Sequence, residues 1–468
     1  MLDLVEKTLK IAEGASKYAE VRYEKSNNNR VIFNNGSLEA VDSTETEGLC
    51  IRILHDGALG LAFTNKFDLS SIKKSINQAK KMAVAAKSIL EKPIIFSEEK
   101  TNQKKYEVKQ KIKLQDLSVE DRVSQLKNID KALSKTKLKL PTRYLELADE
   151  VREKFYVNSE GSKIYSIMPR INFEYLITLY TNQEIVQRIF QIGTCGGWEQ
   201  FEKWHLIKKL TDEAKLLAKI AKAKKSPTGK MDVILSPNLM GIASHESTGH
   251  PYEADRILGR EAAQAGEAFL TKEHLGKRIG SDVVTLVDDP TVPNSYGFYL
   301  YDDEGVEARR RVLIKNGIIN DLLHNRWSAS EFGVKSNGSS RANGWDAEPI
   351  VRMANTFVLP GNHKFEELVE GVKKGIYIKS YMEWNIDDKR YNQRYGGLEA
   401  YEIVNGRIGN LVKKPKIEIT TPAFWSSIDA LSKDFQADTG TCGKGEPMQG
   451  VPVWFGGPHA RLRNVVIT

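Results

Sequence analysis

The N-terminal part of the chain alternates between two kinds of hydrophobic spacing. Residues 2–12 carry an apolar side chain every three or four positions, which predicts an amphipathic helix. Short apolar runs then predict strands at residues 21–24, 31–33, 49–54 and 59–63. The pairs Asn35-Gly36 and Asp56-Gly57 are typical of the turns between them. The next periodic stretch predicts a helix over residues 69–90 that ends before Pro93.

The middle of the chain begins with a charged, irregular stretch at residues 96–113. A helix is expected to begin near Ser118, which can cap it together with Asp121. Strand-like runs return at residues 154–156, 163–167, 171–180 and 184–191. A lysine-rich helical segment then leads to Ser226-Pro-Thr-Gly229, a cluster of breakers that predicts a domain boundary.

Beyond this boundary the pattern consists mostly of strands and turns. Residues 231–235 predict a strand, and Pro237 favours the start of a helix. From residue 283 onward, pairs such as Asn316-Gly317 mark turns, with one helix expected near residues 365–373. We therefore predict an α+β fold, with an N-terminal domain of mixed helices and strands over residues 1–226 and a β-rich C-terminal domain over residues 227–468.

Composition agrees with a globular protein. The chain has 468 residues, of which 40% are hydrophobic and 28% charged, enough for two or three domains. It contains no apolar run long enough to span a bilayer, and its N-terminus lacks the features of a signal peptide. Its three cysteines are too few and too scattered for a disulfide framework. These features predict a cytoplasmic protein without a membrane segment.

The net charge of +8 raises the question of nucleic-acid binding. Four lysines recur at helical spacing within residues 199–230: Lys208, Lys215, Lys219 and Lys222. A single basic helix face is typical of a solvated surface, although a phosphate-binding stripe is the alternative. Because no nucleic-acid fold signature accompanies the lysines, we expect no nucleic-acid partner.

The clearest candidate chemistry lies in the run Gly241-Ile-Ala-Ser-His-Glu-Ser-Thr-Gly-His-Pro251. The imidazoles of His245 and His250 can hold a zinc ion. The carboxylate of Glu246 can accept a proton from the water that such a metal acidifies. The alternative interpretation is a surface helix end with two solvated histidines.

The spacing of these histidines is unusual. They are five residues apart, whereas the common metallopeptidase motif places them four apart on one helix face. On a regular α-helix this separation turns the two side chains about 140° apart. Both can face one metal if the helix widens locally, as in a π-bulge, or if the helix ends between them. Gly249 and Pro251 oppose helix continuation, which makes the second arrangement easy.

A third ligand must come from elsewhere, and the cysteines are candidates. Cys50 lies in an apolar run that predicts a buried strand, so we expect it in the core. Cys195 and Cys442 share the setting Gly-Thr-Cys-Gly, in which glycines let the backbone approach a site closely. Lys444 adds positive charge that favours a thiolate, so composition prefers Cys442 over Cys195, but only weakly.

Longer motifs accompany the histidines across residues 231 to 446. In order, they are His245-Glu-Ser-Thr-Gly-His250, Val287-Asp-Asp289, Asp302-Asp-Glu-Gly-Val306, Leu313-Ile-Lys-Asn-Gly317, Arg352-Met-Ala-Asn-Thr356 with Pro360-Gly361, Glu399-Ala-Tyr401 and Thr441-Cys-Gly-Lys444. Together they resemble the TldD/PmbA family of metallopeptidases. That family divides into a TldD-type subunit with the metal motif and a TldE/PmbA-type subunit without it. The chain is similar to the TldD type because all three metal residues are present.

The resemblance implies Zn2+ bound by His245, His250 and Cys442, with Glu246 as the general base. It also implies that Cys195 lies in a glycine-rich stretch without a ligand. The implied substrates are peptides or unfolded polypeptide segments, cleaved in a chamber between two subunits. The implied assembly is either a homodimer or a heterodimer with a metal-free TldE/PmbA-type subunit.

Several alternatives remain open from the sequence. Glu253 and Asp255 lie close enough to orient a ligating histidine from behind, but a solvated loop acid is equally compatible with each. The same ligands would serve a zinc hydrolase of non-peptide amides. They would also serve a metal-containing peptide-binding or maturation subunit without hydrolytic activity. Structural zinc usually has four protein ligands, and we expect His324, His363 and His459 to be surface or core residues instead.

Overall fold

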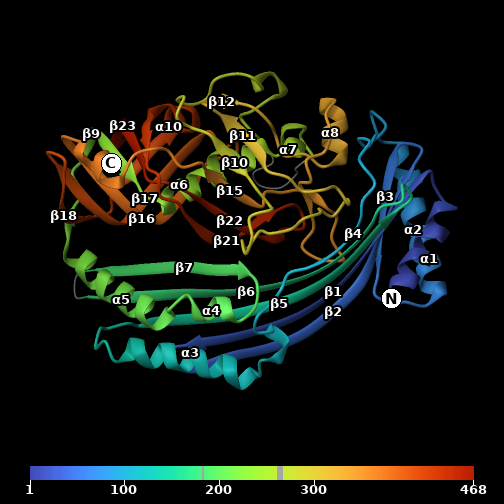
Figure 1. Ribbon diagram of the computed structural model, residues 1–468, viewed down its shortest axis with the longest axis horizontal. Helices are drawn as coiled ribbons and strands as arrows, with labels where there is room; N and C mark the ends of the chain where they lie inside the picture. The colour runs from blue at the N-terminus through green and yellow to red at the C-terminus, as the bar shows by residue number, and fades with distance from the viewer. Residues whose placement is uncertain (182–183, 261–266) are drawn as a thin grey trace.

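A long, curved sheet extends along the molecule in the computed structural model, which describes residues 1–181, 184–260 and 267–468 (Figure 1). Its strands are β1 (Tyr18–Asn34), β2 (Ser37–His55), β3 (Ala58–Thr64), β4 (Gln103–Glu107), β5 (Thr142–Asn158), β6 (Lys163–Tyr180) and β7 (Ile185–Cys195). They are ordered β3-β2-β1-β5-β6-β4, and β7 pairs with β6. Most of the short strands predicted for this part are pieces of longer ones, whereas the runs at residues 59–63 and 184–191 correspond closely to β3 and β7. β4 lies within residues 96–113, which were predicted to be irregular, so that prediction was wrong for β4 and holds for the rest of the stretch.

Helices cover this sheet at its two ends. α1 (Leu2–Glu13) and α2 (Leu69–Lys87) lie at the end that contains β3, whereas α3 (Val119–Ser134), α4 (Glu199–Glu202) and α5 (Leu206–Lys222) lie towards the other end (Figure 1). Ser118 and Asp121 form the expected capping box at the start of α3. Lys208, Lys215, Lys219 and Lys222 of α5 are exposed, as the solvated-face interpretation predicts. Leu210, Ala214 and Leu217 of the same helix are buried.

The second half of the chain forms two further sheets beside the long one. One has the order β12-β11-β10-β15-β22-β21, and the other has the order β16-β9-β23-β19-β17-β18-β8, with β20 attached to β23. Their strands are β8 (Lys224–Lys225), β9 (Gly229–Leu235), β10 (Leu286–Asp288), β11 (Arg311–Lys315), β12 (Ile318–Ile319), β15 (Asn355–Val358), β16 (Lys374–Ile386), β17 (Asn392–Val404), β18 (Arg407–Lys413), β19 (Lys416–Thr420), β20 (Ile428–Leu431), β21 (Gln436–Lys444), β22 (Gln449–Gly457) and β23 (Ala460–Ile467). β13 (Ser340–Arg341) and β14 (Ile350–Val351) pair with each other.

One buried helix connects these two sheets. α6 (Pro237–Ser244) packs against β15, β21 and β22 of the first sheet and against β16 of the second. The remaining α-helices are short: α7 (Ala254–Ile257), α8 (Arg326–Phe332), α9 (Phe365–Glu370) and α10 (Thr421–Ser427). The largest hydrophobic cluster surrounds α6 and includes Leu239, Ile242 and Val453. The segment that carries the histidine motif is therefore part of the core.

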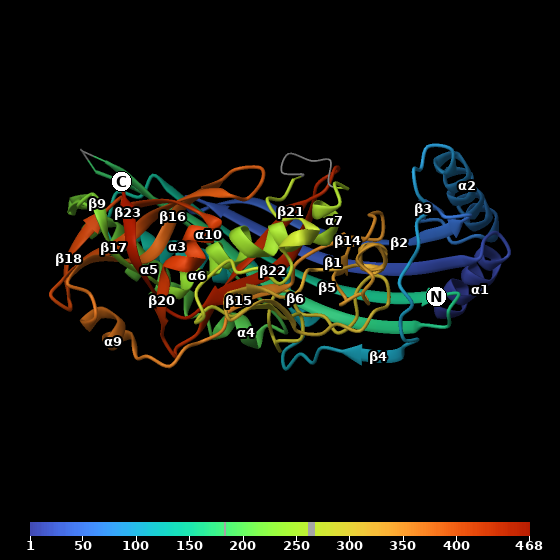
Figure 2. The same cartoon turned by 90° about the horizontal axis from the view of Figure 1, so that it is seen from above.

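The termini lie at opposite ends of the molecule, as Figure 2 shows with α1 and α2 at one end and β9, β18 and the C-terminus at the other. The mixture of helices and strands confirms the predicted α+β class. The division at residues 226 and 227 stays a prediction, and β8, just before it, already pairs with β18. Along the described chain, no helix is both long enough and apolar enough to cross a membrane.

Candidate metal centre

The histidine motif follows directly from α6 through a change of helical pitch. Pro237 begins the helix, and His245–Gly249 then form a π-helical turn in which the His250 N–H donates to the His245 carbonyl oxygen. A short 3-10 turn, His250–Tyr252, follows with Pro251 in its first turn. Of the two arrangements open to the sequence, the chain adopts the local widening. The additional residue in the turn compensates for the five-residue spacing.

Gly249 makes this turn possible in a crowded core. A Cβ atom placed on Gly249 would lie 1.8 Å from Sδ of Met353, far inside van der Waals contact. Met353 belongs to the Arg352-Met-Ala-Asn-Thr356 motif and is fully buried. Glycine is therefore needed here for space, because its backbone angles are ordinary right-handed ones.

The π turn brings both histidines next to Cys442 of β21. One possible ligand atom from each of His245, His250 and Cys442 lies within 4.8 Å of the other two. Nε2 of His250 is 3.4 Å from Sγ of Cys442, and the two imidazole rings are 5.0 Å apart between centroids. Only 6% of His245 and 3% of His250 are exposed. The alternative of two solvated histidines at a helix end is therefore wrong.

Electrostatic interactions give the thiol of Cys442 a different pKa from the thiols of the other two cysteines. Burial alone would raise the pKa of the Cys442 thiol, but the imidazoles of His250 and His245 hold it well below its ordinary value. Burial raises the pKa of Cys195 to about 11 and that of Cys50 to about 12. Burial would lower the pKa of His245, but the neighbouring Cys442 raises it instead. Cys442 is therefore the cysteine whose surroundings stabilise a thiolate.

The donor set suits a zinc ion. Two imidazoles and one thiolate are common zinc ligands, and three protein ligands leave a position for water or substrate. Nδ1 of His245 is buried and has no hydrogen-bond partner among the described residues, which is unfavourable unless another group satisfies it. The residues present therefore fit the metal that the sequence implied.

A buried network of charges supports His250 from behind. Nδ1 of His250 is 3.1 Å from the carboxylate of Glu253, which also lies 3.3 Å from the Lys444 ammonium. Burial would raise the pKa of Glu253, but Lys444 and His250 hold it well below its usual range. Asp255 contacts neither histidine and binds Lys444 at 2.7 Å instead. Both acids are buried, so the solvated-loop interpretation is wrong for each.

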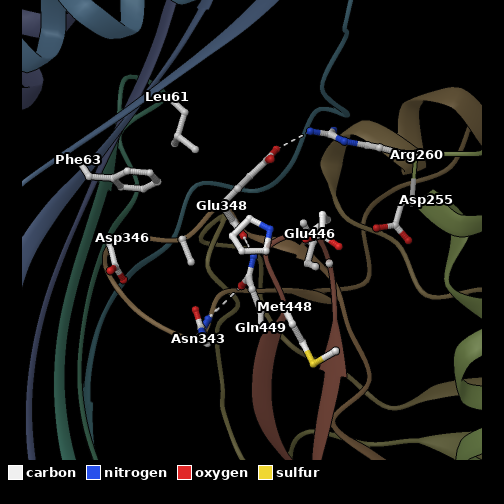
Figure 3. Close-up of a pocket in the computed structure, with 14 residues that line it drawn as sticks. Leu61, Phe63, Asp255, Arg260, Asn343, Asp346, Glu348, Glu446, Met448 and Gln449 are labelled. Atoms are coloured by element: carbon white, nitrogen blue, oxygen red, sulfur yellow. Dashed lines mark hydrogen bonds and ion pairs between the residues drawn. The ribbon is translucent and has the colours of Figure 1, made fainter. Parts of the chain in front are cut away.

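Asp255 connects this network to a second pocket. Asp255 lines a cavity of about 470 Å³ between β3, residues 343–350 and the turn from β21 to β22 (Figure 3). Arg260 and Glu348 form an ion pair at its rim, and Gln449 accepts a hydrogen bond from the Asn343 N–H at 3.2 Å. This cavity does not include the histidines, which line a different pocket.

The pocket at the histidines has a volume of about 490 Å³ and lies between β7 and β21. Glu246 lines it, and both of its carboxylate oxygens are held by the hairpin of β16 and β17. Trp384 donates its indole N–H to one oxygen at 3.1 Å, and Arg390 forms an ion pair with the other. No sequence pattern indicated these contacts, because Arg390 is 144 residues from Glu246 and lies in an ordinary polar turn.

Comparison with known proteins gives the family. The model of the PmbA/TldA metallopeptidase C-terminal domain matches residues 228–468. The models of domain 1 and the central domain of the same family match residues 19–83 and 112–223. The chain therefore belongs to the PmbA/TldA metallopeptidase family.

Individual relatives agree along nearly the whole chain. A protein of Methanocaldococcus jannaschii named as a metalloprotease is 33% identical over 461 residues, 98% of each chain. A zinc metalloprotease TldD homolog of Saccharolobus solfataricus is 26% identical over 98% of each chain. The crystal structure of TldE from Thermococcus kodakarensis has a TM-score of 0.75 at 19% identity, covering 99% of this chain and 100% of that one. This last similarity shows a shared fold.

Proposed function

We propose that the protein is a zinc peptidase in which His245, His250 and Cys442 hold the metal and Glu246 is the general base. The observation that carries this proposal is the buried His-His-Cys cluster, which shares one pocket with the Glu246 carboxylate. When bound, zinc would polarise the scissile carbonyl and make a water molecule more acidic. Glu253, buried against Nδ1 of His250, fixes the orientation of that imidazole.

Glu246 performs the proton transfers in this proposal. Its carboxylate accepts a proton from the attacking water and delivers it to the departing amine. The Trp384 N–H holds one oxygen of the carboxylate in place, which limits the orientations that the side chain can adopt. A positioned base of this kind contributes about 10²–10⁴-fold to the rate.

Two strand edges favour an extended peptide as the substrate. Among the strands that the structure describes, β21 pairs with β22 alone and β7 with β6 alone, and the pocket lies between these two edges. Thr439 and Gly193 already join them through a hydrogen bond of 2.8 Å. A peptide that adds to a strand edge is bound mainly through its backbone, which gives little side-chain preference. Peptides and unfolded segments fit this geometry better than small amides do.

The proposal also covers the assembly of the protein and its location in the cell. We infer a working dimer, formed either by two copies of this chain or with a metal-free TldE-type subunit. The shared fold with TldE supports the second possibility. The three cysteines are free and buried, which suits a reducing compartment such as the cytoplasm.

Replacing Glu246 by Gln tests the mechanism. Gln keeps the shape and the hydrogen bonds to Trp384 but cannot accept the proton, so turnover of peptides should fall by about 10²–10⁴-fold while zinc content stays unchanged. Peptide cleavage assays and elemental analysis of the same preparations measure both quantities. Glu418→Gln is the matched control, because Glu418 lies on β19 with an exposed side chain that pairs with Arg394.

The same experiment separates the alternatives. Near-normal turnover by a zinc-loaded Glu246→Gln chain would contradict the proposed base. A chain that binds zinc and peptides but cleaves neither peptides nor small amides would be a binding or maturation subunit. Faster cleavage of small amides than of peptides would indicate a different hydrolase.

A further inference from the structure

One hairpin supplies two hydrogen-bond donors to the wall of the metal-centre pocket. Trp384 lies on β16, and Arg390 lies in the turn between β16 and β17. Both side chains hold the Glu246 carboxylate. Because an indole N–H and a guanidinium can only donate, this wall of the pocket can bind only acceptor groups, such as the oxygen of a carbonyl or a carboxylate.

The guanidinium of Arg390 has donor capacity that the protein does not use. Its Nε atom is buried and has no hydrogen-bond partner within the described part of the chain. Only 14% of the side chain is exposed, so water satisfies it poorly. An unpaired buried donor is unfavourable for the folded chain. Arg390 lines the pocket, so a ligand with an oxygen acceptor that enters there meets its guanidinium.

The backbone of Arg390 is held firmly. The Thr421 hydroxyl donates to the Arg390 carbonyl oxygen at 2.7 Å. Asp387 accepts from the backbone N–H groups of Tyr391 and Asn392 at 2.7 and 3.0 Å. Arg390 itself has a left-handed φ of 64°. A donor fixed in this way can stabilise a developing charge without reorganisation, which is the requirement for electrostatic catalysis.

Arg390 also differs in charge from the other residues that line the pocket. Of the residues described around this pocket, the ionisable ones are Glu174, Glu246, the two histidines, Tyr381, Cys442 and Arg390. Arg390 is thus the permanent cation among them. Amide hydrolysis places negative charge on the carbonyl oxygen as the water oxygen bonds to the carbonyl carbon. Metal peptidases need a donor for this oxygen, and no other cationic side chain in this set can serve.

We propose that Arg390 is a catalytic residue that donates a hydrogen bond to the scissile carbonyl oxygen, while Trp384 continues to hold Glu246. The inference rests on the proposed peptidase function. The new bond joins the water oxygen to the carbonyl carbon, and the water proton moves to Glu246. The carbon–nitrogen bond then breaks, and that proton passes to the amine. Arg390 keeps all its protons throughout.

Ligand binding to the zinc-loaded protein tests this role without turnover. A phosphinic peptide carries an anionic oxygen where the carbonyl oxygen would be, whereas the same peptide with a reduced bond has no oxygen there. In calorimetry, Arg390→Met should lower the affinity for the phosphinic peptide by about 10²-fold and the affinity for the reduced peptide by less than about threefold. Arg394→Met is the matched control, because Arg394 lies on β17 but is exposed and pairs with Glu418 at 2.8 Å. It should change neither affinity.

Kinetics supply the second readout. Arg390→Met should lower kcat by about 10²–10³-fold with little change in KM, and Arg390→Lys should retain more activity. In the binding experiment, an equal loss of affinity for the phosphinic and the reduced peptide, or no loss for either, would show that Arg390 only orients Glu246. Either result would overturn the proposal. A loss that disappears when the peptide has an amidated C-terminus would also overturn it, because Arg390 would then bind a terminal carboxylate.

Different results would contradict the peptidase function and the role of Arg390. If the unaltered zinc-loaded chain, with its working partner present, neither binds the phosphinic peptide nor cleaves any peptide, the peptidase function is wrong and the role of Arg390 falls with it. If the unaltered chain does both and Arg390→Met does so equally well, only the role of Arg390 is wrong.

Discussion

Cys195 and Cys442 share the local sequence Gly-Thr-Cys-Gly but have different surroundings in the folded chain. Cys195 packs with Met168, Tyr299 and Ala354 in an apolar cluster. Cys442 faces two imidazoles instead. The chemistry of each thiol is therefore decided by residues distant in sequence, and the two cysteines provide a natural pair of variants.

Replacing Cys442 by Ser should remove zinc or weaken its binding severely, whereas Cys195→Ser should leave zinc stoichiometry unchanged. The reason is that a serine hydroxyl stays protonated and binds zinc poorly, while Cys442 is held as a thiolate. Elemental analysis of the two purified variants measures the difference. Full zinc in the Cys442 variant would place the third ligand elsewhere.

His324 gives a prediction about stability. Its side chain is 2% exposed, and burial lowers its pKa from 6.5 to about 4. Below pH 6.5 the unfolded chain takes up a proton that the folded His324 refuses until about pH 4. The free energy of unfolding therefore includes a contribution from neutral His324 that is fully present above pH 6.5. This contribution is lost as the pH falls to 4, a decrease of about 3 kcal/mol.

The measurement is urea unfolding of the metal-free protein at several pH values between 4 and 7. In His324→Asn this part of the pH dependence should be missing, because the amide does not titrate. Parallel profiles for the variant and the unaltered chain would show that His324 is not the group responsible.

At the level of single residues, the sequence indicated the histidines and Glu246 because they stand together in one short motif. It indicated Cys442 only through a family resemblance, since Gly-Thr-Cys-Gly occurs twice. Arg390 and Trp384 were beyond sequence reasoning. Their position depends on how the β16–β17 hairpin folds over α6, which no local spacing encodes.

At the scale of elements, the π turn depends on the contact between Gly249 and Met353. Gly249→Ala should lower the free energy of unfolding by about 1–3 kcal/mol, because the new methyl group would overlap Sδ of Met353. Met353→Ala in the same chain removes the atoms that clash. The double variant should therefore lose less stability than the sum of the two single variants.

Thermal or denaturant unfolding of all four chains completes this cycle. Strict additivity would show that the two side chains do not meet. Zinc content should follow the same order as stability, because the turn orients both histidines.

Element prediction succeeded for the N-terminal helices but missed α8 and α10, and it was incomplete for strands. α1, α2 and α3 follow the predicted periodicities closely, and the capping residues of α3 are correct. β1, in contrast, continues through Lys25-Ser-Asn-Asn-Asn29, a polar run that reads as a break in a strand. Pairing with β2 and β5 on both sides holds this run extended. Such tertiary support is invisible in local hydrophobicity.

At the scale of the whole molecule, the metal-centre pocket lies where the long sheet meets the second half of the chain. β7 forms one side and β21 the other (Figure 1). A folded protein has its strands already paired and cannot place an extended segment between them without local unfolding. The position of the pocket therefore restricts which polypeptides reach it.

The working unit should be a dimer that cleaves short peptides and denatured chains quickly and stable folded proteins slowly. Light scattering gives the mass of the assembly, and one protein offered in folded and in denatured form compares the two rates. If a second subunit is required, the isolated chain will bind zinc but cleave poorly until that subunit is added. A fully active monomer that cuts both forms equally would contradict this prediction.

The π turn of His245–Gly249 also has a consequence for ancestry. Relative to an ordinary helical turn it contains one inserted residue, equivalent to a single in-frame codon. Deleting one buried position of the turn, such as Thr248, would place the two histidines four residues apart, the spacing that shares one face of an ordinary α-helix. No series of substitutions therefore connects this motif to the four-residue spacing. An alignment between the two needs a gap inside the helix, and a search pattern with fixed spacing will pass over this chain.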